Sequence, residues 1–177
     1  LSSAFVPAFT RYLKQGRREA AELAHLVATA LILFVGLICA LGMVFSPALV
    51  GLLAPGFAAV PGKFELAAGL TRIMFPFLLL VALAAQAMGV LNACNQFGVP
   101  ALASAFFNAG SVAFGLLLGF GFGPWLGIAP IEGMAYGVVL GGAWQLLWQW
   151  PSLHRAGFGF RLRFDFSHPG LRQVLGL

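Results

Sequence analysis

The stretch that decides the fold is LTRIMFPFLLL, residues 70–80, where an arginine and a proline begin a long apolar run. At about 1.5 Å per residue, residues 66–93 are long enough to cross the roughly 30 Å hydrocarbon core of a bilayer. Pro76 has no N–H for the carbonyl group of Arg72, so the helix is expected to be disturbed at the arginine. We therefore predict that Arg72 lies at the outer boundary of a membrane span, where its long side chain reaches the headgroups.

The composition of the whole chain extends this pattern. Hydrophobic residues make up 60% of the 177 residues and charged residues only 8%, whereas soluble domains carry about 25% charged residues. Such a chain cannot cover itself with polar side chains in water, so lipid must be its main solvent. The net charge of +5 is not gathered on a water-soluble face, which argues against nucleic-acid binding. The sequence predicts an all-α, polytopic membrane helix bundle.

Four complete transmembrane helices are expected, each bounded by charges or turn formers. The approximate spans are residues 23–45, 66–93, 101–120 and 131–150. Residues 1–15 are expected to be the end of a preceding helix, and residues 167–177 the start of a following one. The chain is therefore expected to be part of a longer protein.

Two shorter elements are expected between and after the spans. Residues 48–54, ALVGLLA, favour a short interfacial helix after the first span. Apolar and polar residues alternate over residues 158–166, which suggests a short extended strand.

Basic residues mark one side of the predicted bundle. They occur before the first span, in residues 11–22, and again after the fourth, in residues 155–172. An even number of spans returns the chain to the side on which it started. By the positive-inside rule, both segments are expected to be cytoplasmic.

The sequence contains no recognisable catalytic motif and no metal-binding motif. His25, His154 and His168 lie near predicted water boundaries, and there is no HExxH motif, CxxC motif or carboxylate pair inside a span. Cys39 and Cys94 are far apart in apolar surroundings, so we expect no disulfide between them. We predict a protein that is not an enzyme and uses no cofactor or metal.

Polar side chains within the spans have two interpretations. They either hold helices together by hydrogen bonds or line the path of a substrate. The residues concerned include Gln86, Asn92 and Asn108 and the pair Gln145 and Gln149. Two GxxxG spacings, at residues 115–119 and 137–141, favour close packing of helices.

Several stretches together resemble one family, the lipid II flippases (MurJ/MviN) of the multidrug/oligosaccharidyl-lipid/polysaccharide exporter superfamily. They are SSAFVPAFTRYL at residues 2–13, LLAPGF at 52–57, residues 70–108 beginning LTRIMFPFLLL, and GVVLGGAWQLLWQWPSL at 137–153. The resemblance covers essentially the whole chain in order and spacing.

The resemblance implies a transporter of fourteen helices in two lobes around a cationic cavity. Such a protein moves the undecaprenyl-pyrophosphate-linked peptidoglycan precursor from the cytoplasmic to the periplasmic leaflet of the bacterial inner membrane by alternating access. The present chain would be a partial N-terminal lobe, without the helices that carry most of the cavity arginines. Other expected partners are membrane lipids.

The resemblance and the polar residues together give a set of substrate-path candidates. They are Ser2, Ser3, Arg72, Asn92 and Asn108. Ser2 and Ser3 belong to the remnant of a cavity helix that the resemblance implies. Two other functions stay open: an exporter of another lipid-linked saccharide or of drugs, and a membrane scaffold that transports nothing.

Overall fold

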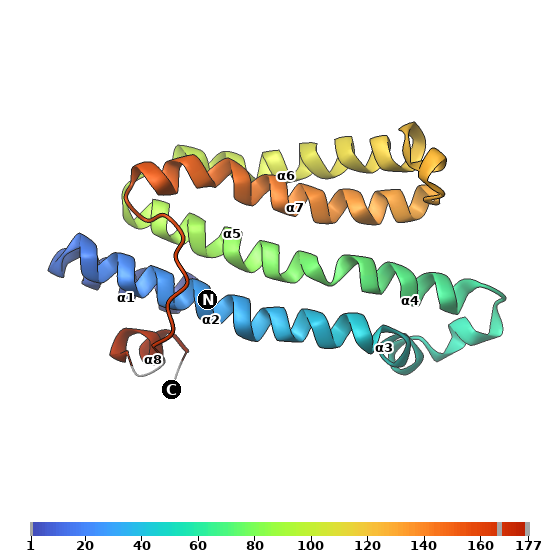
Figure 1. Ribbon diagram of the computed structural model, residues 1–177, viewed down its shortest axis with the longest axis horizontal. Helices are drawn as coiled ribbons and strands as arrows, with labels where there is room; N and C mark the ends of the chain where they lie inside the picture. Colours follow the sequence, from blue (N-terminus) through green and yellow to red (C-terminus); the bar gives the residue numbers. More distant parts are fainter. Residues whose placement is uncertain (1, 166–167, 176–177) are drawn as a thin grey trace.

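The fold is an antiparallel arrangement of long helices (Figure 1). The computed structural model describes residues 2–165 and 168–175, and the side chains of residues 2–4, 172, 173 and 175 lie outside the description. The helical elements are α1 (Ser2–Gln15), α2 (Arg17–Val44), α3 (Ser46–Leu53), η1 (Pro55–Ala59), α4 (Lys63–Met74), α5 (Pro76–Ala93), α6 (Gly98–Leu116), η2 (Leu117–Gly121), η3 (Gly123–Leu126), α7 (Pro130–Arg155) and α8 (Pro169–Leu175).

Three segments of the described chain are long and apolar enough to cross a membrane: Arg17–Val44, Lys63–Ala93 and Gly98–Gly121. Much of their surface faces outward, since only 17% of the most apolar window of Gly98–Gly121 is buried. Outward apolar surface of this extent needs lipid or further protein to cover it. The chain is therefore an all-α, polytopic membrane helix bundle, as predicted.

The prediction of four complete spans needs correction, because α7 does not meet the same criterion of composition. α7 has 26 residues and the length to cross, but it contains Gln145, Gln149 and Glu132 and a basic last turn, which lower its hydropathy. It still runs antiparallel to α6 and returns the chain to the end of the bundle where α2 begins (Figure 1).

The second span is broken near Pro76, close to the predicted position. α4 ends at Met74 and α5 begins at Pro76. At this break the Cys39 thiol donates a hydrogen bond of 3.1 Å to the carbonyl group of Phe75. The Phe75 ring lies against Gly42, where any side chain would overlap it. Proline chemistry and contacts with α2 therefore both define the break.

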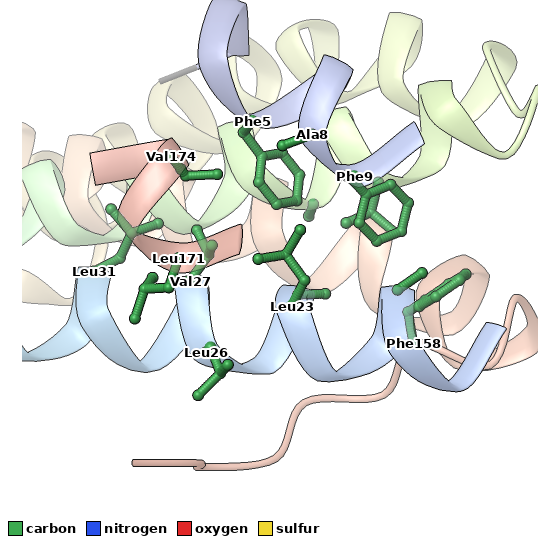
Figure 2. Close-up of a cluster of buried hydrophobic side chains, with 14 of the residues drawn as sticks. Phe5, Ala8, Phe9, Leu23, Leu26, Val27, Leu31, Phe158, Leu171 and Val174 are labelled. Atoms are coloured by element: carbon green, nitrogen blue, oxygen red, sulfur yellow. The ribbon is translucent and has the colours of Figure 1, made fainter. Parts of the chain in front are cut away.

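The hydrophobic core lies at one end of the bundle. α1 folds back along the first half of α2, and their buried side chains meet the end of α5, the end of α7, the segment that follows it, and α8 (Figure 2). Phe9 is completely buried and contacts Phe158 with a ring-centroid distance of 5.3 Å. This core fixes the two basic segments next to one another. α8 (Pro169–Leu175) lies within residues 167–177.

Glycines bring α6 and α7 into close contact, the most extensive between any two elements. A Cβ atom at Gly137 would overlap the backbone of Gly115, and one at Gly141 would lie 2.7 Å from the backbone nitrogen of Ser111. The two GxxxG segments therefore meet where Gly137 packs against Gly115, and these glycines allow the backbones to approach.

Residues 158–165 contain no regular secondary structure, so the predicted strand is wrong for this described part. A strand needs a partner strand for its backbone groups, and the described residues provide none. Its backbone is held by a side chain instead: the N–H of Arg163 donates to Thr29 Oγ1 at 3.0 Å. The short helix predicted over residues 48–54, in contrast, corresponds to α3, and its interfacial position stays a prediction.

Candidate functional site

The substrate-path candidates from the sequence do not lie together. Arg72 is exposed near the end of α4, whereas Asn92 is near the far end of α5, about 30 Å away along the helix axis. Asn108 is exposed partway along α6, and its carbonyl group accepts a bond from Ser111 Oγ at 3.0 Å. The side chains of Ser2 and Ser3 lie outside the described residues.

The buried glutamines connect helices. Gln86 Nε2 donates a hydrogen bond of 2.7 Å to the carbonyl group of Ala24, which joins α5 to α2. Gln149 is fully buried, and its Nε2 lies 3.4 Å from the carbonyl groups of Ala84 and Gln145. These contacts agree with the interpretation of the glutamines as packing groups rather than as a substrate path.

A basic pocket is the strongest candidate for a functional site, and it lies at the end of the bundle where α2 begins. Its volume is about 720 Å³. It is formed by the first turns of α2, the last turns of α7 and the segment that follows α7. The lining residues are Arg18, Ala21, Glu22, His25, Trp150, His154, Gly157, Gly159, Phe160, Arg161 and Arg163.

The segment after α7 takes its course from the end of that helix. Gly157 has a φ of 85°, the left-handed conformation that commonly ends helices. The N–H of Phe158 then bonds the carbonyl group of Leu153 at 3.0 Å, and the buried Phe158 ring joins the core. Residues 159–163 consequently pass over the start of α2.

Polar contacts with α2 hold this segment in place. His25 Nε2 donates a hydrogen bond of 2.5 Å to the carbonyl group of Gly159. Arg163 Nη1 forms an ion pair of 2.6 Å with Glu22 Oε1. The Arg163 side chain is 54% exposed, so we expect this pair to add little stability and mainly to set the position of the segment.

The positive charge of the pocket exceeds its negative charge. Glu22 is the one acidic residue in its lining and is paired with Arg163. Arg18 and Arg161 have no ion-pair partner among the described residues. His25 and His154 line the same pocket. The pocket therefore favours an anion.

An apolar pocket of about 170 Å³ adjoins the basic pocket. It lies between α2, α5 and α7, and its lining includes Ala28, Ile32 and Leu83. His25, Trp150 and Phe160 line both pockets. The two spaces thus form one amphipathic site, with cations at the end of the bundle and apolar side chains deeper among the helices.

The pKa of one thiol at the same end of the bundle is shifted. Burial raises the pKa of Cys94, which follows α5, and the charge of Arg17 acts in the opposite direction. Both cysteines are free thiols.

Sequence reasoning treated the basic residues of this site only as markers of topology. From the sequence alone, His25 and His154 are residues at predicted water boundaries, and Arg18, Arg161 and Arg163 are parts of basic segments. The signal in the sequence is that His25 and His154 each lie beside one of the two basic segments. Their convergence depends on the turn at Gly157 and on the burial of Phe158.

Comparison with known proteins gives one consistent result. The family model described as "Lipid II flippase MurJ" matches residues 1–177. The chain is 30% identical over 175 residues to a "Probable lipid II flippase MurJ" of Buchnera aphidicola subsp. Acyrthosiphon pisum, covering 98% of this chain and 33% of the relative. It is 30% identical over 179 residues to the "Lipid II flippase MurJ" of Burkholderia cenocepacia, covering 98% and 34%. The chain thus spans about one third of the length of these relatives.

Proposed function

Because this chain belongs to the lipid II flippase MurJ family, we propose that the protein containing it moves lipid II from the cytoplasmic to the periplasmic leaflet of the bacterial inner membrane. The observation that carries the proposal is the match of the family model over all 177 residues. The protein is then a transporter rather than an enzyme, and its substrate is the undecaprenyl-pyrophosphate-linked peptidoglycan precursor.

The chemistry of such a substrate agrees with a helix bundle of this kind. A pyrophosphate head is very costly to move through hydrocarbon, whereas the polyprenyl tail dissolves in lipid. A transporter with two lobes can let the head cross in a polar cavity while one lobe moves against the other. We propose that this chain is most of the N-terminal lobe, and that the break at Phe75 in the second span lets that span bend during the movement.

The orientation follows from the basic segments. The described parts of residues 11–22 and 155–172 lie at the same end of the bundle (Figure 1). By the positive-inside rule, that end faces the cytoplasm. The basic pocket would then open on the cytoplasmic side, from which lipid II departs, and the break at Phe75 would lie toward the periplasm.

The test uses the full-length protein in liposomes that carry fluorescent lipid II and, in parallel, a fluorescent phosphatidylglycerol. We expect lipid II to become accessible from the opposite leaflet while phosphatidylglycerol does not. Movement of another polyprenyl-linked saccharide but not of lipid II would instead identify a related exporter. If the protein moves none of these lipids and also fails to restore growth of a flippase-depleted strain, a scaffold would be favoured.

A further inference from the structure

The basic and apolar pockets at the start of α2 have the two halves of a lipid-binding site. A lipid needs charge complementarity at its phosphate and an apolar space for a chain, at the depth where headgroup meets hydrocarbon. Both are found here and share the lining residues His25, Trp150 and Phe160. Trp150 marks the expected depth, since tryptophan is enriched at membrane interfaces.

We propose that this site binds one anionic phospholipid of the adjacent leaflet. Its phosphate lies among Arg18, His154 and Arg161, and one acyl chain enters the apolar pocket beside Ala28 and Leu83. Basic pockets between transmembrane helices on the cytoplasmic side are known to hold acidic lipid headgroups. The leaflet assignment rests on the orientation proposed above; the site itself does not.

The arrangement of charges makes an anionic lipid the best occupant. Arg163 is already engaged by Glu22 at 2.6 Å, so its charge is largely neutralised. Arg18 and Arg161 have no such partner among the described residues and are exposed at the mouth of the pocket. A zwitterionic headgroup would bring its own cation close to these two arginines, whereas phosphatidylglycerol brings only the phosphate charge.

The lipid would also have a structural effect. The segment at residues 159–163 is held on α2 by the bond from His25 and the ion pair from Glu22, and it lies between the end of α7 and α8. A headgroup between Arg18 on α2 and Arg161 on this segment would tie the two together. The site therefore connects lipid binding to the position of the segment leading out of the bundle.

The test measures lipid retention by the full-length protein using native mass spectrometry after delipidation. Palmitoyl-oleoyl phosphatidylglycerol is titrated against phosphatidylcholine with the same chains. The variant R18Q/R161Q removes the charges of the two pocket arginines that have no ion-pair partner among the described residues. The matched control, K14Q/R155Q, removes two positive charges at the same end of the bundle from residues outside both pockets.

We expect phosphatidylglycerol to bind more tightly than phosphatidylcholine. R18Q/R161Q should weaken its binding about 30-fold, as expected for two arginines near a lipid headgroup, and the control should change it less than about threefold. Equal losses in both variants would show a general charge effect and overturn the proposal. So would equal affinity for the two lipids, or no retained lipid at all.

Two further arms identify the ligand and the pocket. Inorganic phosphate should compete only weakly, because it lacks an acyl chain, and undecaprenyl pyrophosphate should not displace phosphatidylglycerol from the site. Displacement at equal concentration would make the substrate lipid the occupant and refute the phospholipid assignment.

A photoactivatable acyl chain should crosslink to the peptides that contain Ala28 or Leu83, and crosslinks confined to other helices would contradict the proposed position. Loss of lipid II transport with lipid retention intact would affect only the proposed function.

Discussion

The Nε of Arg72 donates a hydrogen bond of 3.1 Å to the carbonyl group of Met43. In a regular helix, the N–H of residue 47 would bond this carbonyl group, but residue 47 is a proline. The carbonyl group of Arg72 also lacks a helical donor, because the residue four positions later, Pro76, has no N–H. Two prolines on different helices thus leave two carbonyl groups free of helical bonds, and the Arg72 side chain bonds one of them.

This relationship gives the first prediction. R72A should destabilise the protein by about 1 kcal/mol through the lost hydrogen bond. In a P47A background the same change should cost less, because an alanine in place of Pro47 supplies an N–H to the carbonyl group of Met43. The measurement is a double-mutant cycle of thermal unfolding in detergent. Additive effects of R72A and P47A would mean that the two groups do not serve the same carbonyl group.

The charge of Arg72 can be tested separately. R72K keeps a cationic donor and should be tolerated, whereas R72E puts a carboxylate near a carbonyl oxygen and should impair folding or transport. Lipid II transport is measured at matched protein abundance. Full activity of the R72E protein at normal abundance would show that Arg72 is neither a required contact of the substrate nor a required cap.

The glycine interface between α6 and α7 gives another prediction. G137A places a methyl group against the backbone of Gly115 and 2.7 Å from the carbonyl oxygen of Ser111. Overpacking of this kind costs roughly 1–3 kcal/mol, seen as a lower unfolding temperature in detergent. G69A, on α4, is the matched control, because nothing lies within 4 Å of the added methyl group. A destabilised G69A protein, or an unaffected G137A protein, would contradict the close packing.

The buried glutamines should differ in their response to removal. Gln86 Nε2 makes a hydrogen bond of 2.7 Å, so Q86M should lower the free energy of unfolding by about 1 kcal/mol. Gln149 Oε1 is buried and has no partner within the described residues, so Q149M should be neutral or stabilising. Unfolding in detergent measures both. Loss of transport by a stable Q149M protein would return this residue to the substrate path.

Cys94 provides a prediction about pH. Burial raises the pKa of its thiol, and the thiolate is the reactive form. Alkylation of Cys94 should therefore reach half of its maximal rate at a higher pH than alkylation of a free thiol. R17Q removes the opposing charge and should move this midpoint to a still higher pH, whereas R17K should not. Peptide mass spectrometry of Cys94 measures the rate, and a midpoint unaffected by R17Q would exclude the influence of Arg17.

The sequence was informative where a property is local. The break at Pro76 was predicted because a proline removes one hydrogen bond at a known position. The basic residues of 11–22 and 155–172 predicted that the two segments lie on the same side, and their described parts do lie at one end of the bundle (Figure 1). The count of four apolar spans failed for α7, because close packing against α6 lets a helix rich in glycine and glutamine occupy the place of a more apolar one. The alternation at residues 158–166 failed because no strand was available as a partner in the described chain.

By itself, then, the sequence determined a polytopic helical membrane protein, its family resemblance, the approximate ends of its long helices and the break near Pro76. These features follow from composition and from interactions within a few residues. Only the tertiary structure decided that Arg72 meets Met43, that Gly137 packs against Gly115, and that Arg163 pairs with Glu22, 141 residues away. Such contacts depend on which helix faces pack together, and a single-helix periodicity carries no information about the partner face.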